Sequence, residues 1–298
     1  MNSSLTIGVD IGGTKVAAGL VDSGGAITRK VRVPMVATAD AATGFAAVRE
    51  AVESLLREAP DARARMTGIG ICSPGPLDPK TGIVLCPPNV PCWRNFPLAD
   101  ETAKAFQLPV RVDNDANAAG LAEAIWGAGI GYTNVFYATL GTGIGTGIVF
   151  DRKIYHGRTG AAAEGGHVSI DYNGPVCGCG KRGCIEILCS GPAIARRAGM
   201  PRAEDVGAAY RAGDAAAARV LTEIADLLAV WLGNTVDLLE PDVMIVGGGV
   251  AELMAPFFDH IRAAIPKWSI NPRANEVPLL MARYGADSGV AGAASLVG

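Results

Sequence analysis

The chain has 298 residues, of which 49% are hydrophobic, and a formal net charge of −3. This length exceeds what one hydrophobic core usually fills, so we expect two lobes. The small negative charge, without a run of lysine or arginine, excludes the basic surface that nucleic-acid binding needs. No apolar run is long enough to cross a membrane, and no signal peptide precedes the first predicted strand, so we expect a cytoplasmic protein with seven reduced cysteines.

The first third of the chain alternates short apolar runs with turns that contain glycine. Residues 5–9, 16–21 and 27–33 predict three antiparallel strands in a meander. Apolar side chains then recur at helical spacing over residues 45–59, and residues 68–72 predict a buried strand.

The same plan recurs further along the chain. Residues 134–140 and 144–150 predict a hairpin, a long amphipathic helix ends at Glu240, and residues 243–246 predict a strand. Two such units in tandem indicate an α/β fold made of two duplicated lobes with a cleft between them.

We place the first lobe at residues 1–113 and the second at residues 114–285. Residues 286–298 are rich in glycine and alanine, which predicts a closely packed helix that folds back onto the first lobe.

A glycine-rich turn, Asp10-Ile-Gly-Gly-Thr-Lys15, lies between two predicted strands. Rossmann and Walker loops open onto helices, so this turn is neither. Its glycines would let backbone amides approach phosphate oxygens, Thr14 could add a hydroxyl, and Asp10 could hold Mg²⁺. A hairpin turn with a solvated aspartate explains the segment about as well.

A second hairpin has glycine at every second position from 141 to 147. Glycine weakens a strand unless something must approach its backbone closely, and a triphosphate is such a ligand. The alternative is a bulged turn. Two hairpins of this kind at equivalent places favour a nucleotide.

The segment Arg111-Val-Asp-Asn-Asp-Ala-Asn117 follows a short strand and precedes a helix. Asp113 and Asp115 could both serve as helix N-caps. Asn114 and Asp115 also offer an amide and a carboxylate, and a carboxylate can accept a hydroxyl proton during phosphoryl transfer. We favour Asp115 as a general base over a purely structural cap.

Three cysteines lie within eight positions, and a histidine lies ten residues upstream of the first of them. Cys177, Cys179, Cys184 and His167 form a Cys₃His set, which is typical of structural zinc. The alternative is a loop of reduced cysteines without metal. Glu164 and Glu186 flank this cluster as carboxylates that the metal does not need.

These segments, together with Ser73-Pro-Gly-Pro-Leu77, resemble the ROK family of sugar kinases and sugar-responsive repressors, which has the actin-like ATPase (ribonuclease H-like) fold. The resemblance implies that Mg²⁺ and ATP are bound by Asp10, Gly12, Gly13, Thr14, Lys15, Thr142 and Gly143, with Gly247 and Gly248 near the adenosine. It implies that sugar hydroxyls are held by Gly75, Asn89, Asn114, Asp115, Glu164, His167 and Glu186. His167 would then be both a zinc ligand and a sugar contact, and Asp115 would be the base.

The resemblance implies ATP-dependent phosphorylation of the 6-hydroxyl of a hexose, with glucose as the first expectation. Kinases for N-acetylmannosamine, N-acetylglucosamine, mannose or fructose are the alternatives within the family. A sugar-sensing regulator is less expected, because such proteins carry a helix-turn-helix domain before this turn and only nine residues precede Asp10. The family also implies a homodimer.

Overall fold

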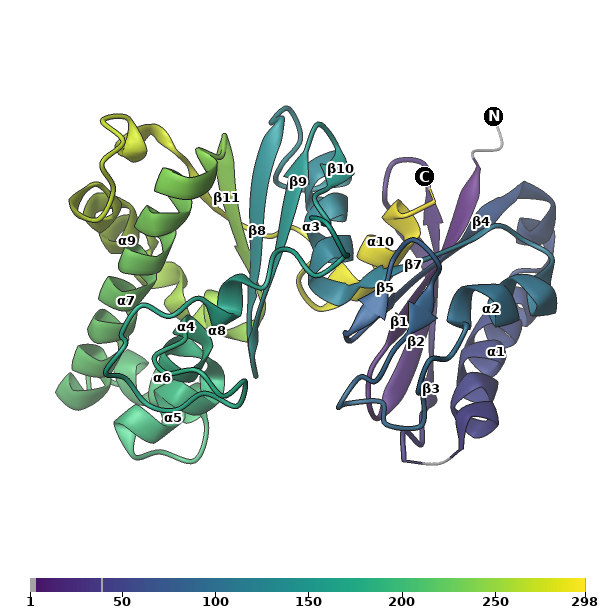
Figure 1. Ribbon diagram of the computed structural model, residues 1–298, viewed down its shortest axis with the longest axis horizontal. Helices are drawn as coiled ribbons and strands as arrows, with labels where there is room; N and C mark the ends of the chain where they lie inside the picture. The colour runs from purple at the N-terminus through teal and green to yellow at the C-terminus, as the bar shows by residue number, and fades with distance from the viewer. Residues whose placement is uncertain (1–3, 39, 298) are drawn as a thin grey trace. The chain divides into compact units, whose positions relative to one another are not determined.

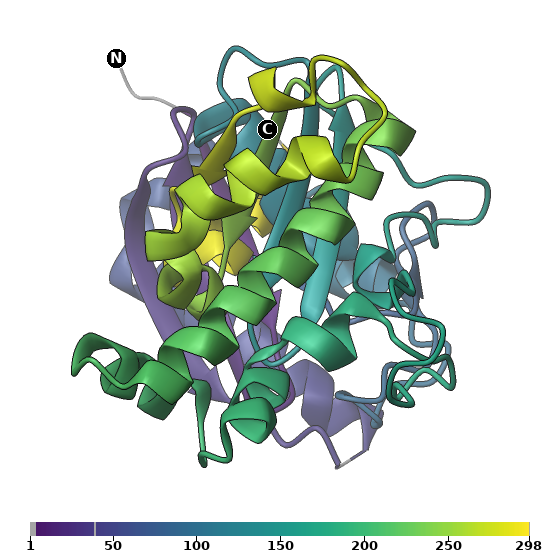
Figure 2. The ribbon, with the colours of Figure 1, turned by 90° about the vertical axis from the view of Figure 1, so that its left-hand side faces the viewer.

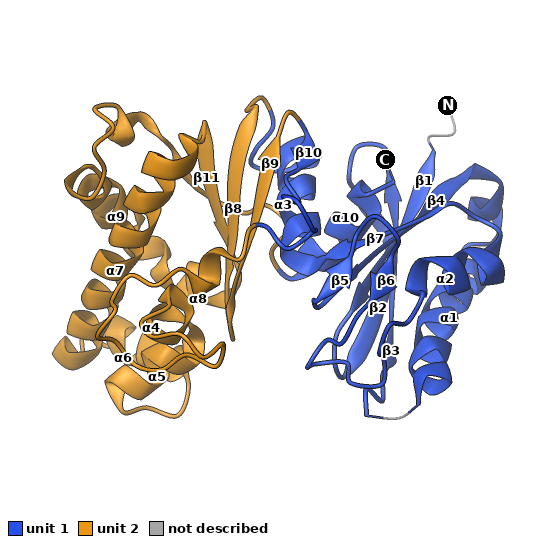
Figure 3. Ribbon diagram, viewed as in Figure 1, with its two compact units in different colours: residues 1–130, 152–162, 286–298 blue, residues 131–151, 163–285 orange. Residues whose placement is uncertain are grey.

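The computed structural model describes residues 4–38 and 40–297, and the ends of the predicted lobes at residues 1–3 and 298 lie outside this range. The chain divides into two compact units (Figure 3). Unit 1 contains residues 1–130, 152–162 and 286–298, and unit 2 contains residues 131–151 and 163–285.

The division differs from the predicted boundary at residue 113, because helix α3 (Asp115–Trp126) groups with unit 1. Helix α3 packs against helix α10 (Ser288–Ser295), and Ala118 and Ala293 share a buried cluster there. The chain also returns to unit 1 at residues 152–162, which include the short strand β10 (Lys153–Ile154).

Unit 1 is built on a five-stranded sheet (Figure 1). The first three strands form the predicted antiparallel meander, and the other two run parallel to β1. The strand order across the sheet is β3 (Ile27–Pro34), β2 (Lys15–Asp22), β1 (Leu5–Ile11), β4 (Met66–Ser73) and β7 (Val110–Asn114).

Helix α1 (Ala41–Glu58) contributes Val48, Val52 and Leu55 to the main core of unit 1. The Asp40 side chain caps it by accepting a hydrogen bond from the Thr43 N–H. The rest of this unit contains a small hairpin and one more helix, namely β5 (Leu77–Asp78), β6 (Ile83–Val84) and α2 (Leu98–Phe106).

Helix α10 approaches the sheet of unit 1 at backbone-to-backbone distance. A Cβ atom on Gly70 would lie 1.7 Å from the Ala293 carbonyl oxygen, and one on Gly8 would lie 2.0 Å from the Val290 carbonyl oxygen. Because backbone atoms cannot move aside as a flexible side chain does, glycine is required at both strand positions.

We expect Gly70→Ala to destabilise the protein by about 3 kcal/mol or more, because the added methyl group must push α10 off β4. Thermal or denaturant unfolding measures the loss. Gly249→Ala is the matched control, because a Cβ atom there meets nothing within 4 Å. Equal stability of the two variants would contradict this packing.

Unit 2 carries a second sheet, in which β8 pairs antiparallel with β9 and parallel with β11. The strands of this sheet that belong to unit 2 are, in order, β9 (Ile144–Phe150), β8 (Asn134–Leu140), β11 (Val243–Gly247) and β12 (Leu279–Met281). These bounds confirm the predicted hairpin and the strand that follows the long helix.

The long helix α7 (Ala215–Leu239) lies across one face of this sheet (Figure 2). It ends where Glu240 adopts a left-handed conformation with φ of 43°, directly before Pro241. The other α-helices in the described part of unit 2 are α4 (Ile185–Cys189), α5 (Gly191–Ala198), α6 (Ala203–Arg211), α8 (Gly249–Met254) and α9 (Phe258–Ala264). Among the described residues, none of the helices has both the length and the hydropathy to span a bilayer.

Candidate active site

The glycine-rich turn of unit 1 connects β1 to β2. The Gly12 N–H donates to the Lys15 carbonyl oxygen at 2.9 Å, which closes the turn. A Cβ atom on Gly13 would lie 2.6 Å from the Asn89 carbonyl oxygen, so the loop that carries Asn89 passes directly against the turn. Thr14 and Lys15 are exposed to solvent and available to a ligand.

Asp10 lies near the end of β1 and packs closely against Cys72 and Gly289. The Cys72 S–H donates to its Oδ1 at 3.5 Å, and a Cβ atom on Gly289 would lie 2.4 Å from its Cγ. Burial raises the pKa of Asp10, and the Cys72 hydrogen bond and the charge of Lys15 oppose this shift. A carboxylate oxygen is the kind of hard donor that Mg²⁺ binds, so Asp10 fits the predicted role.

The start of helix α3 is capped by Asn114. Its Oδ1 accepts hydrogen bonds from the N–H groups of Ala116 at 2.9 Å and Asn117 at 3.4 Å. The alternative that Asp113 or Asp115 caps the helix is therefore excluded, because Asn114 is the cap. Neither aspartate fills the cap position, so helix capping does not account for the Asp115 carboxylate.

Asp115 is the first residue of α3 and keeps one side open to solvent. The protein packed around its other sides desolvates the carboxylate and raises its pKa to about 6, the Ala116 N–H opposes the shift, and the negative charge of Asp10 adds to it. A pKa close to neutrality suits a general base. The Cβ position of Gly75 lies 3.7 Å from Asn114 Nδ2, so these two predicted sugar contacts are neighbours.

The four predicted zinc ligands converge in unit 2. Their ligand atoms all lie within 4.8 Å of one another, with 3.6 Å between the sulfur atoms of Cys179 and Cys184 and 3.8 Å between Cys177 Sγ and His167 Nδ1. Ligands in a tetrahedron around zinc are about 3.3–3.8 Å apart, given the usual bond lengths. These two separations lie within that range, and three thiols with one imidazole are a donor set that suits structural zinc.

Glu186 joins this cluster to the glycine-rich hairpin of unit 2. Its Oε1 lies 3.9 Å from His167 Nδ1, and its Oε2 accepts a hydrogen bond from the Ile144 N–H at 2.9 Å. A Cβ atom on Gly143 would lie 2.6 Å from Oε2, so the hairpin passes directly against this carboxylate. Glu164 is exposed, and its carbonyl oxygen accepts from the His167 N–H, which closes a short turn.

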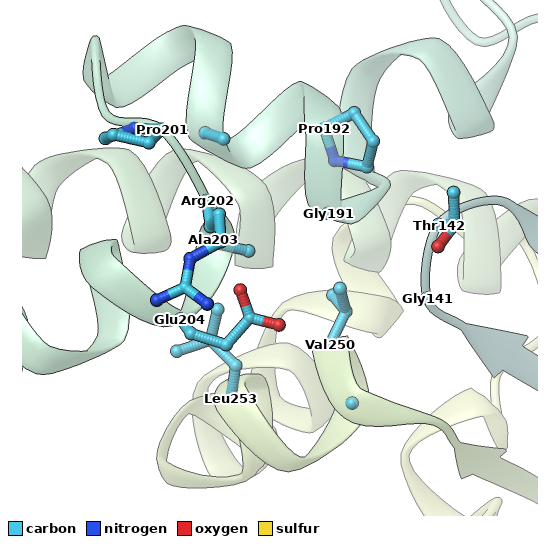
Figure 4. A pocket seen from close by; sticks show the side chains of 12 residues that line it. Gly141, Thr142, Gly191, Pro192, Pro201, Arg202, Ala203, Glu204, Val250 and Leu253 are labelled. Carbon is cyan, nitrogen blue, oxygen red and sulfur yellow. The ribbon is translucent and has the colours of Figure 1, made fainter.

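A cavity of about 440 Å³ lies beside the same hairpin (Figure 4). Gly141 and Thr142 form one side, and Figure 4 shows Arg202 and Glu204 together on another side. Its other lining residues are Gly191, Pro192, Ala195, Pro201, Ala203, Gly249, Val250 and Leu253.

The sequence analysis predicted Thr142 in this region but missed the residues that α5 and α6 contribute. The predicted Gly247 and Gly248 directly precede two lining residues, Gly249 and Val250. Gly248 has φ of 90°, and a Cβ atom there would lie 2.4 Å from the Leu140 carbonyl oxygen. Glycine at this position therefore allows the end of β11 to approach the hairpin closely.

Comparisons with known proteins identify the family of this chain. The sequence model of the ROK family matches residues 6–298. The glucokinase of Thermotoga maritima is 35% identical, over 98% of this chain and 96% of its own. A solved ROK family glucokinase from Streptomyces griseus, in complex with glucose and AMPPNP, is 36% identical over 99% of each chain, with a TM-score of 0.82. A ROK hexokinase from Thermus thermophilus is 35% identical over 98% of this chain and 97% of its own, with a TM-score of 0.84.

These similarities confirm the predicted actin-like ATPase fold, since they cover both α/β units with their sheets and helices. The family match covers nearly the whole length, and the relatives align end to end with this chain. The chain therefore belongs to the ROK family.

Proposed function

We propose that the protein is an ATP-dependent kinase that phosphorylates the 6-hydroxyl of glucose. The observation that carries this proposal is the Asp115 carboxylate, which has a pKa of about 6 and lies beside the amide of Asn114. The similarity to glucokinases over nearly the full length supports the choice of sugar.

Asp115 acts as the general base. Above pH 6 its carboxylate is mostly ionised and can accept the proton of the attacking hydroxyl. Asn114 uses Oδ1 for the helix cap, which leaves its Nδ2 as a donor for a sugar oxygen. The other sugar contacts in the proposal are Gly75, Asn89, Glu164, His167 and Glu186.

A structural zinc ion on the Cys₃His set would hold the loop that carries His167 and Glu186. His167 presents Nδ1 to the cluster, which leaves Nε2–H to donate to a sugar hydroxyl. Glu186 keeps its orientation because the Ile144 N–H fixes one of its oxygens.

The cavity beside the hairpin is assigned to the nucleoside of ATP, with Thr142 and Gly143 near its phosphates. In unit 1, Asp10 would hold Mg²⁺. When bound, this ion neutralises charge on the phosphates during transfer. Gly13, Thr14 and Lys15 would supply a backbone amide, a hydroxyl and an ammonium group to the same phosphates, and Gly12, whose N–H closes the turn, would let them approach the backbone.

We expect Asp10→Ala to raise the KM for Mg-ATP and lower kcat by about 10-fold or more, because the proposed metal ligand is lost. Glucose binding without nucleotide should stay within about 2-fold, which calorimetry measures. Asp61→Ala is the matched control, because Asp61 is exposed and lies outside the proposed site. Equal losses of nucleotide and glucose binding would point to a folding defect and refute a local role.

The test of the proposed function is ADP release, measured by a coupled assay, with glucose, mannose, fructose, N-acetylglucosamine and N-acetylmannosamine. The proposal expects glucose to give the highest kcat/KM. A higher value for another sugar would move the assignment within the family, and no ADP release with any of the five would refute it. The homodimer and the cytoplasmic location stay predictions from the sequence analysis.

A further inference from the structure

Asp113, at the end of β7, is a buried carboxylate next to the proposed base. Only 4% of the residue is exposed, and its charge therefore needs hydrogen-bonding partners within the protein. Its Oδ1 accepts from the Asn114 N–H at 2.7 Å and from Asn117 Nδ2 at 3.1 Å. These two donors flank Asp115, one in the last residue of β7 and the other in the first turn of α3.

The third partner of Asp113 comes from 43 residues further along the chain. His156 Nε2 lies 2.6 Å from Asp113 Oδ2, and the imidazole is partly buried. The sequence analysis assigned no role to this histidine. Its segment, residues 152–162, also packs on unit 1 at Gly160, where a Cβ atom would lie 2.7 Å from Pro79 Cδ.

The charges around His156 favour its protonated form. The hydrogen bond to Asp113 raises the pKa of His156, while burial and the positive charge of Lys80 oppose the shift. The charge-assisted bond to a buried carboxylate is stronger and shorter than a neutral one.

We propose that His156 is a positioning residue, which acts through Asp113 to fix Asn114 and Asp115 in their working geometry. This inference rests on the proposed function, because it explains how Asp115 is positioned to act as the base. If His156 is lost, Asp113 keeps a buried charge with one donor fewer, and its side chain must move toward solvent. This movement disturbs the hydrogen bonds to Asn114 and Asn117 that hold the start of α3.

The variants His156→Ala and His156→Gln test this role in the full-length protein. We expect His156→Ala to lower kcat/KM for glucose by about 10–100-fold, the usual cost of losing a group that orients an active-site residue. His156→Gln keeps a side-chain N–H that can reach Asp113 and should recover activity to within about 3-fold of wild type. The KM for ATP should change by less than about 2-fold in both variants.

His260→Ala is the matched control. His260 Nε2 lies 2.7 Å from Asp226 Oδ1, but this pair is exposed and lies in unit 2. We expect this control to keep wild-type kinetics. Wild-type activity in folded His156→Ala, or a His156→Gln variant as impaired as His156→Ala, would overturn the proposal.

A second readout does not depend on glucose phosphorylation. In an NMR titration, the backbone amide signal of Asn114 should follow the protonation of His156, and in Asp113→Asn the two should become uncoupled. If the wild type phosphorylates no hexose, the proposed function fails. This titration still decides whether the pair of Asp113 and His156 holds the junction between β7 and α3. An Asn114 signal that ignores the titration of His156 would refute the positioning role.

Discussion

Asp115→Asn should lower kcat for glucose phosphorylation by about 10²–10⁴-fold, the range expected when a general base is lost. The amide has nearly the same shape as the carboxylate and can still accept a hydrogen bond from the Ala116 N–H, so the start of α3 should stay intact. Glucose affinity should therefore change by only a few fold. Steady-state kinetics and calorimetry on the same preparation separate the two quantities.

The pKa of Asp115 also predicts the pH dependence of the reaction. Because this pKa is raised to about 6, the base becomes protonated and kcat should fall as the pH drops through 6.

The raised pKa of Asp115 has the opposite effect on the stability of the fold. Asp115 ionises less easily in the folded than in the unfolded protein, so its charge opposes folding above pH 6 and stops doing so as the pH falls. Asp115→Asn should thus melt at the same or a higher temperature at pH 8.

Asp61→Asn is the matched control for both measurements, because it replaces an exposed aspartate outside the proposed site. It should leave kcat and its pH profile unchanged. If Asp115→Asn kept near-normal kcat, the base would have to be assigned to another group. A lower melting temperature would show that Asp115 contributes to the stability of α3.

The sequence predicted most strands and the long helices because their apolar residues repeat with clear periods. The hairpin over residues 134–150 and helix α7 are found where the patterns place them. The assignment of α3 to unit 1 could not be predicted in the same way. It depends on close packing between small residues such as Ala118, Gly292 and Ala293, and an alanine-rich helix shows no strong apolar face.

The candidate site was predictable where ligand spacing is short, and the four atoms of the Cys₃His set do converge. Long-range partners gave no such signal. His156 meets Asp113 across 43 residues, and the cavity beside Thr142 is completed by α5 and α6. A local clue existed for the cavity in Ser190-Gly-Pro192, a glycine and a proline at a helix start. The cap at Asn114 was missed because three adjacent residues could each have filled it.

Cys179→Ser should produce protein that lacks zinc and has a KM for glucose raised by at least about 10-fold. A four-ligand site leaves no open position for substrate, so the metal would act by holding the loop. Loss of the metal frees His167, whose Nδ1 lies 3.9 Å from Glu186 Oε1, so the Ile144 N–H alone is left to orient Glu186. Elemental analysis should find about one zinc ion per chain in the wild type.

The KM for ATP in Cys179→Ser tests whether loss of zinc also affects nucleotide binding. Glu186 also accepts a hydrogen bond from the Ile144 N–H in the hairpin that carries Thr142, so a small rise in the KM for ATP should accompany the larger loss of sugar affinity. Cys86→Ser is the matched control, because Cys86 is an exposed free cysteine outside the cluster and should keep wild-type zinc content and kinetics. Wild-type protein that contains no zinc and phosphorylates glucose at full rate would refute the structural metal. A raised KM in Cys179→Ser would then have to come from the hydrogen bonds among the thiols themselves, such as the 3.6 Å contact between Cys179 and Cys184.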